Sequence, residues 1–264
     1  MALIYLNDIR LNTEISGPVD GAGLVLIHAL GTRLELWDEL VALLPKSLRI
    51  LRYDQRGHGA SDVPAPPYAM GALIRDAERL MDHFAMRDAA VLGISLGGLV
   101  AQGLAVKRLD LVRALVLSNT ATRIGTKEMW QQRIDQIEKT GLEPYADGAM
   151  ERIFGRKFRD QAAMPHLRAM LTHTDPHGWI GCAAAIAGSD FYATTASLTL
   201  PTLAIAGAND GSTPADLVRE TADLILDSRF ALIRGAGHLP MVEKPRDYAD
   251  VLTGFLHDIG QVRA

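Results

Sequence analysis

Ser95 is the residue of this sequence that is best placed to act as a nucleophile. It lies at the centre of a Gly-x-Ser-x-Gly pattern, directly after a short apolar run that begins at Ala89. Such a pattern between a buried strand and a helix indicates a sharp turn that exposes the serine hydroxyl. Gly93 and Gly97 leave the necessary room, because a side chain at either position would collide with the neighbouring strand and helix.

A serine hydroxyl needs a general base, and the base needs a third group to orient it. His238 follows a Gly-Ala-Gly stretch after the last predicted strand, and Asp210 follows the predicted strand before it. An acid after a still earlier strand would be the main competitor, but Asn119 occupies that position. The carboxyl ends of parallel strands meet at one edge of a sheet. We therefore predict that Ser95, His238 and Asp210 form a catalytic triad.

The attacked carbonyl oxygen becomes negatively charged, and two backbone N–H groups are needed to stabilise it. One donor is expected from Leu96, the residue after the nucleophile, and the other from the loop over residues 28–31. We predict Leu30 as the second donor, because Gly31 behind it permits the turn. His28 precedes this donor and is expected to hold the loop through hydrogen bonds.

The other histidines and the single cysteine give weaker signals. His58 lies between two glycines and is expected to stabilise a turn. His166, His173 and His177 do not predict a metal site, because an Asp-Pro pair interrupts their helical spacing and no cysteine joins them. Cys182, in an alanine-rich stretch, is expected to be a small core residue. We predict no metal and no cofactor, since the triad and the two amides supply the chemistry.

These residues need a sheet to bring them together. Strands are predicted at residues 24–27, 48–53, 89–93, 114–117, 202–206 and 230–233, and the runs at 24–27, 89–92 and 114–117 are continuously apolar, as in buried strands. Helical spacing between these runs, including a helix predicted over 99–108, indicates parallel β-α-β units. Residues 9–15 alternate between apolar and polar side chains, which predicts a half-exposed antiparallel strand with Ile15 on its apolar side. The predicted fold class is therefore α/β, a mostly parallel central sheet flanked by helices.

The alternation of predicted strands and helices is interrupted between residues 120 and 197. Apolar residues there fall at helical spacing, as Trp130 and Ile137 do, and the segment has no convincing strand pattern. We predict that residues 120–197 form a helical cap inserted above the sheet. The core domain is then expected to comprise residues 1–119 and 198–264.

Composition predicts a globular protein that acts on a small molecule. The 264 residues are 48% hydrophobic and 22% charged, and no apolar run approaches the length of a membrane span. The net charge of −4 argues against nucleic acid as a partner. One cysteine excludes an intrachain disulfide, and no signal peptide is recognisable at the N-terminus. We expect a cytoplasmic location and no membrane partner, and leave open whether the chain forms a homo-oligomer.

Four stretches of the sequence together resemble the 3-oxoadipate enol-lactonase family of α/β-hydrolases. They are residues 26–37, 51–61, 93–98 and 119–125. The chain order Ser95, Asp210, His238 is also that of α/β-hydrolases. The most specific stretch is the start of the cap, where residues 119–125 are followed by Trp130 and Arg133. The resemblance runs nearly end to end and implies an α/β-hydrolase fold with a helical cap.

The resemblance implies that a lactone ester is the substrate. Ser95 would attack the lactone carbonyl of 3-oxoadipate enol-lactone, the enol would leave and become a ketone, and water would release 3-oxoadipate, a step of aromatic catabolism. A substrate carboxylate calls for a cation in the cap. Arg133 beside Trp130 is our first choice, with Arg123 and Arg156 behind it.

The sequence departs from the resemblance at one position of the cap. An Arg-Asp pair is expected there, and this chain has Ala187-Gly188. If that arginine helps to hold the substrate in the family, the substrate of this chain differs.

Other functions use the same triad, so the cap has to distinguish them. A carboxylesterase, a perhydrolase of the haloperoxidase type and a carbon–carbon bond hydrolase are the enzymatic alternatives. An apolar cap pocket would favour a broad esterase, and a cationic pocket would favour the lactone acid. A receptor or binding protein of the hydrolase fold is the non-enzymatic alternative, and labelling of Ser95 without turnover would indicate it.

Overall fold

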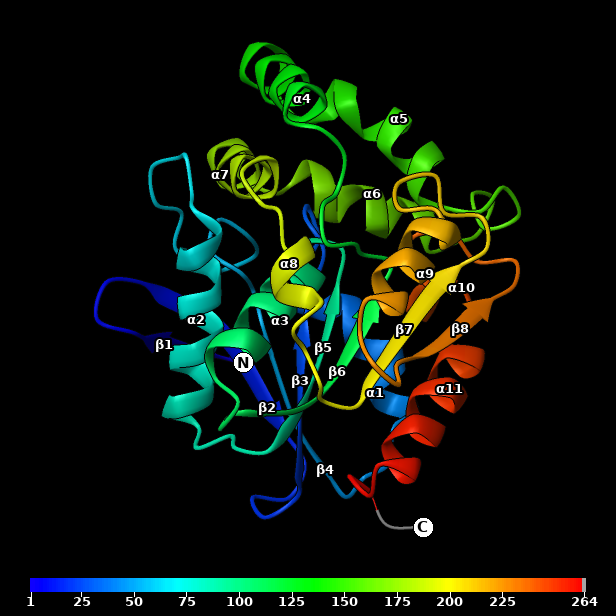
Figure 1. The fold of residues 1–264 in the computed structure, drawn as a ribbon. Coiled ribbons are helices and arrows are strands. Elements are labelled where there is room, and N and C mark those ends of the chain that lie inside the picture. The colour runs from blue at the N-terminus through cyan, green and yellow to red at the C-terminus, as the bar shows by residue number, and fades with distance from the viewer. Residues whose placement is uncertain (263–264) are drawn as a thin grey trace.

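The computed structural model describes residues 1–262 and contains one eight-stranded sheet (Figure 1). The strands are β1 (Ala2–Tyr5), β2 (Arg10–Ser16), β3 (Ala22–Ile27), β4 (Leu48–Tyr53), β5 (Ala89–Ile94), β6 (Val112–Ser118), β7 (Thr202–Gly207) and β8 (Arg229–Ile233). The α-helices are α1 (Asp38–Leu43), α2 (Met70–His83), α3 (Leu96–Lys107), α4 (Lys127–Thr140), α5 (Glu143–Ile153), α6 (Met164–Thr172), α7 (Pro176–Ala187), α8 (Tyr192–Thr195), α9 (Ala215–Asp223), α10 (Pro240–Glu243) and α11 (Pro245–Asp258). A 3-10 turn, η1 (Leu34–Trp37), precedes α1.

The sheet is parallel except at one side. Its strand order is β1-β2-β4-β3-β5-β6-β7-β8, and only β2 runs antiparallel to its neighbours, β1 and β4. The strands from β4 to β8 pair in parallel, so their carboxyl ends meet at one edge of the sheet. The predicted fold class, an α/β-hydrolase fold with a mostly parallel sheet, is confirmed.

The central strands are buried because helices cover both faces of the sheet. Every residue of β5 is buried, as its continuous apolar run predicts. In Figure 1, α2 and α3 lie in front of the sheet and pack against each other, and α1 packs against α11 behind it. In α2, Leu73, Ala77 and Leu80 recur at helical spacing and are fully buried, so this face holds the helix against the core.

The segment between β6 and β7 contains the helices α4 to α8 and, within the part that the structure describes, no strand. Figure 1 shows α4 to α7 above the carboxyl ends of the strands, where β5, β7 and β8 lead into the loops of the predicted site. Trp130, Ile134 and Ile137 lie on one side of α4 and are buried. This side faces α7, against which α4 packs. None of the helices in residues 1–262 combines the length and the apolar character needed to cross a membrane.

Candidate active site

Ser95 lies in the tight turn between β5 and α3. Its backbone has φ 55° and ψ −117°, a conformation that costs free energy for a residue with a side chain. The Oγ1 of Thr120 donates a hydrogen bond to the carbonyl oxygen of Ser95 over 2.7 Å and helps to hold the turn. A Cβ on Gly93 would lie 2.0 Å from the carbonyl oxygen of Gly97, and one on Gly97 would lie 2.1 Å from that of Ile27. Only glycine fits at either position.

His238 and Asp210 lie side by side after β8 and β7. The Nδ1 of His238 is 2.8 Å from Oδ2 of Asp210. That carboxylate also accepts hydrogen bonds from Nδ2 of Asn119 (2.8 Å) and from Oγ1 of Thr213 (2.7 Å). Burial acts to raise the pKa of Asp210, but His238 and these donors outweigh it and hold the pKa below its usual value. An ionised Asp210 keeps the proton on Nδ1, so Nε2 of His238 can accept a proton.

Ser95 and His238 line the same pocket, which has a volume of about 170 Å³. Asp210 lies behind His238, with a side chain that is fully shielded from solvent. Within residues 1–262, Oγ of Ser95 forms no hydrogen bond to another side chain. Hydrogen bonds between a nucleophile and its base are often long without substrate and tighten when it binds. The structure therefore brings the three predicted residues together at one edge of the sheet.

Leu30 and Leu96 provide two backbone N–H groups near Ser95. Leu30 lines the pocket, and Leu96 is the first residue of α3, directly after Ser95. Neither N–H donates to an acceptor in the described part of the chain. N–H groups of the first helical turn have no partner within the helix and are suited to bind negative charge.

Two buried histidines hold the loop that contains Leu30. The Nε2 of His28 accepts the N–H of Gln55 over 2.9 Å, and Nε2 of His58 accepts the N–H of Gly31 over 2.9 Å. Burial lowers the pKa of His28 to about 4 and that of His58 to about 3. Both rings are therefore neutral at pH 7, which these accepting bonds require. The prediction that His28 fixes this loop is confirmed, and His58 does more than stabilise a turn.

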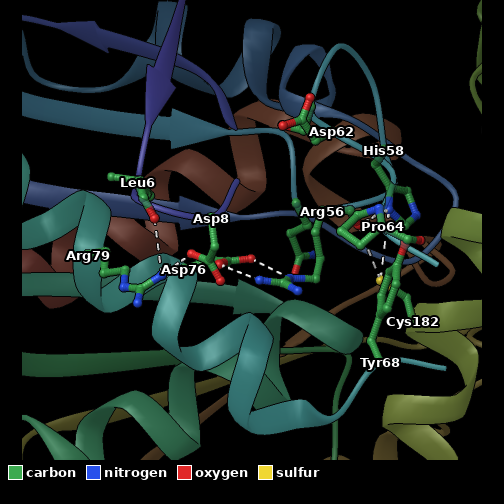
Figure 2. Close-up of polar contacts among 12 residues, drawn as sticks. Leu6, Asp8, Arg56, His58, Asp62, Pro64, Tyr68, Asp76, Arg79 and Cys182 are labelled. Carbon is green, nitrogen blue, oxygen red and sulfur yellow. Dashed lines mark hydrogen bonds and ion pairs between the residues drawn. The ribbon is translucent and has the colours of Figure 1, made fainter. Parts of the chain in front are cut away.

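A buried ion pair formed by Arg56, two residues before His58, lies near this histidine (Figure 2). The guanidinium of Arg56 pairs with both carboxylate oxygens of Asp76, at 2.6 and 2.7 Å, and lies over the ring of Tyr68. The carbonyl oxygen of Arg56 is 3.2 Å from Nδ1 of His58 and 3.5 Å from Sγ of Cys182. Cys182 is fully buried in the hydrophobic core, as predicted, and this burial raises the pKa of its thiol well above the usual value.

The cap supplies the wall of the pocket opposite Ser95, and this wall contains two arginines. The guanidinium of Arg133 lies 4.8 Å from the ring centre of Trp130, and that of Arg152 lies 5.3 Å from the ring centre of Tyr145. Neither arginine forms an ion pair with a carboxylate of residues 1–262. Burial lowers the pKa of Arg133, and the charge of Arg152 adds to this effect. The pocket therefore holds positive charge that no described carboxylate neutralises.

Arg152 was not predicted from the sequence, although it lines the pocket. Tyr145, Ala149 and Arg152 all line the pocket from α5, and their spacing of four and three residues places them on one helix face. This spacing was a signal that could have identified the arginine. Arg123 and Arg156, the other arginines considered for the substrate carboxylate, do not line the pocket. Both are exposed, and Arg123 lies beside Asp190.

The predicted departure at Ala187-Gly188 also lies away from Ser95. These two residues are at the C-terminal end of α7, and neither is among the described residues that line the pocket. His166, His173 and His177 are exposed on the cap. In the described chain, no three or more histidine, cysteine, aspartate or glutamate side chains gather where they could hold a metal ion.

Comparisons with known proteins give one consistent family. The family model described as "alpha/beta hydrolase fold" matches residues 24–245. The 3-oxoadipate enol-lactonase 2 of Acinetobacter baylyi is 31% identical over 245 residues, which are 91% of each chain. The 3-oxoadipate enol-lactonase 1 of the same organism is 30% identical and covers 94% of each chain.

Solved structures agree with the relatives found by sequence. A crystal structure of a hydrolase from Pseudomonas aeruginosa has a TM-score of 0.93 at 34% identity and covers 97% of both chains. The enol-lactonase from Burkholderia xenovorans has a TM-score of 0.93 at 31% identity and covers 97% of this chain and 99% of its own. The fold, the arrangement around Ser95 and these similarities lead to one conclusion: the chain belongs to the α/β-hydrolase family and is a hydrolase.

Proposed function

We propose that this hydrolase opens the lactone ring of 3-oxoadipate enol-lactone and uses Ser95, His238 and Asp210 as its catalytic triad. The observation that carries the proposal is the pair of unneutralised arginines on the wall opposite Ser95. The similarity to two enol-lactonases and to the structure of a third supports the substrate. A cationic wall suits a lactone that carries a carboxylate, whereas a broad esterase has no need of it.

The proposed reaction proceeds through an acyl-enzyme. Nε2 of His238 takes the proton from Ser95, and Oγ attacks the lactone carbonyl, whose oxygen is stabilised by the N–H groups of Leu30 and Leu96. When the tetrahedral intermediate collapses, the ring C–O bond breaks and His238 protonates the leaving enol, which becomes a ketone. A water molecule, deprotonated by His238, then attacks the acyl group and releases the new carboxylate and Ser95.

The substrate carboxylate is proposed to bind at the arginine wall. Arg133 lies over Trp130, so its planar guanidinium is held by stacking and can make two parallel hydrogen bonds to a carboxylate. Arg152 adds a second positive charge to the same pocket. Trp130 itself donates its Nε1 hydrogen to the carbonyl oxygen of Ile124 over 2.6 Å, which fixes the ring that supports Arg133.

A comparison of substrates tests the proposal. Turnover is measured for the enol-lactone, for its neutral methyl ester and for nitrophenyl acetate, with the wild type and with Arg133→Met. A charge-assisted hydrogen bond contributes about 1.5–3 kcal/mol, so we expect KM for the enol-lactone to rise about 10- to 100-fold in the variant while the methyl ester is little affected.

The matched control is Arg123→Met, which removes an exposed arginine of the same segment outside the pocket. We expect it to leave both KM values unchanged. Preference of the wild type for the neutral esters, with no effect of Arg133→Met, would instead assign the chain to the carboxylesterases. Covalent labelling of Ser95 without turnover of any of the three compounds would favour the receptor.

A further inference from the structure

Glu243 is a buried carboxylate that the proposed reaction does not use. It ends α10, five residues after His238, and only 8% of the residue is exposed. Its Oε1 accepts the N–H of Gly237 over 2.7 Å, and its Oε2 accepts the N–H of Gly155 over 3.0 Å. Gly237 precedes His238, whereas Gly155 belongs to the cap. One side chain therefore joins the loop of the proposed base to the cap.

Backbone contacts show how closely the two parts meet. The N–H of His238 donates to the carbonyl oxygen of Ile153 over 2.6 Å, and the N–H of Gly211 donates to that of Arg152 over 3.1 Å. A Cβ on Gly237 would lie 2.3 Å from the carbonyl oxygen of Ile153, so only glycine permits this approach. The end of α5 is thus hydrogen-bonded to the loops of both His238 and Asp210.

The carboxylate of Glu243 lies there at an energetic cost. Burial raises its pKa to about 7, and the nearby Asp210 adds to the shift. No lysine or arginine of the described residues forms an ion pair with Glu243. A buried carboxylate without a cation depends on N–H donors for its stability. The carboxylate of Glu243 is therefore stabilised by the N–H groups of Gly155 and Gly237, and it links these two segments of backbone.

We infer that Glu243 is a positioning residue that fixes the backbone of His238 against the end of α5, so that the cap and the base move as one unit. The inference rests on the proposed role of His238 as the base. The same end of α5 provides Arg152 and Ile153 to the pocket wall. A substrate held by the cap is thereby placed at a set distance from the base, and displacement of a reacting group by about 1 Å can cost about 100-fold in rate.

The variant Glu243→Gln tests this role with almost no change of shape. Its amide nitrogen turns an N–H group toward one of the two backbone amides, so one of the two hydrogen bonds is lost. Its matched control is Glu151→Gln, which removes an exposed carboxylate from α5, the helix whose end Glu243 is inferred to hold. The readouts are kcat, KM and the low-field proton resonance of the hydrogen bond between His238 and Asp210.

We expect kcat of Glu243→Gln to fall about 10- to 100-fold while KM stays within about twofold, because the base and not the substrate contact is displaced. The His238 resonance is expected to shift or broaden, and Glu151→Gln is expected to leave all three readouts unchanged. An unchanged kcat with an unchanged His238 resonance would overturn the inference.

Hydrogen exchange in the wild type gives a test that does not depend on folding of the variant. If Glu243 joins the two segments, the amides of Gly155 and Gly237 open together and exchange at the same rate, within about threefold. Rates that differ by more than about tenfold would overturn the inference. Full activity of Ser95→Ala would refute the proposed function alone, because the exchange rates and the His238 resonance are measured without substrate.

Discussion

Asp210 is the residue on which the orientation of His238 depends. Three side chains meet at its carboxylate, and His238 donates to it from Nδ1 at 2.8 Å. An asparagine at this position can present an N–H group to Nδ1, which stabilises the wrong tautomer and leaves the proton on Nε2. Nε2 could then no longer accept the proton of Ser95.

Replacement of Asp210 by asparagine is therefore expected to lower kcat about 10,000-fold while the fold is retained. Initial rates with the enol-lactone and the thermal unfolding midpoint are measured side by side. Asp216→Asn, on the exposed side of α9, makes the same chemical change outside the site and serves as the control. Loss of activity in both variants, or in neither, would refute this role of Asp210.

Single residues were predicted where a local pattern identifies them. The Gly-x-Ser-x-Gly pattern and the strand ends before Asp210 and His238 are all readable along the chain. Glu243 was missed because its partners, Gly155 and Gly237, belong to different segments, and nothing in the sequence shows that these segments touch. Arg152 was missed for a similar reason, since only the packing of α5 over the pocket distinguishes it from an exposed arginine.

At the scale of elements, the segments that follow β3 and β4 are joined by hydrogen bonds. Their contacts include the accepting bonds of His28 and His58, together with the N–H of Leu34, which donates to Oδ1 of Asp54 over 2.7 Å. A protonated imidazole cannot accept a hydrogen bond, so these contacts require neutral rings. The loop of Leu30 is therefore expected to lose stability in acid.

The sign of this pH effect follows from the pKa of His58. Its folded value is about 3, below the ordinary 6.5, so between these values the unfolded chain binds a proton that the folded protein does not. Stability is therefore lost as the pH falls from about 6.5 toward about 3. Between pH 7 and pH 5 we expect His58 alone to lower the free energy of unfolding by about 2 kcal/mol.

Urea unfolding at these two pH values measures the effect in the wild type and in His58→Gln. The glutamine oxygen can still accept the N–H of Gly31 but does not titrate, so this variant is expected to lose about 2 kcal/mol less than the wild type. His83→Gln, on the exposed side of α2, controls for the loss of an imidazole. Equal losses in the wild type and His58→Gln would contradict the assignment.

Element boundaries were least predictable where tertiary contacts override local preference. The helix after Ser95 was expected to begin at Leu99, yet α3 begins at Leu96. Glycine weakens the helical pattern at position 98, where it is required because a Cβ would lie 2.4 Å from Thr120. In β2, Ile15 is exposed although alternation placed it on the buried side. Asn12 is buried instead, because its amide donates to Asp54 over 2.8 Å.

Strand β1 was not predicted at all. Its side chains are largely exposed, and it is placed at the edge of the sheet by antiparallel pairing with β2. An exposed edge strand lacks the regular apolar residues by which buried strands are recognised in a sequence. The strands β3 to β7, in contrast, are rich in buried apolar residues and were predicted to within two residues.

On the scale of the whole molecule, the proposed anionic lactone lies between a core that carries the proposed nucleophile and a cap that carries the arginines. The core contributes Ser95, Asp210 and His238, and the cap contributes Arg133 and Arg152. The core residues that are proposed to react could be proposed from the sequence because they lie at strand ends. The binding half was predictable only in part, since helices of the cap can present either of two faces to the pocket.

The most direct test of the proposed reaction is the rate at which the ultraviolet absorbance of 3-oxoadipate enol-lactone disappears, measured with the wild type and with Ser95→Ala. We expect rapid ring opening by the wild type and at least about a thousandfold loss of kcat in a folded Ser95→Ala. Equal rates in the two proteins would contradict the role of Ser95. A wild type that hydrolyses nitrophenyl acetate and leaves the lactone intact would contradict the proposed substrate.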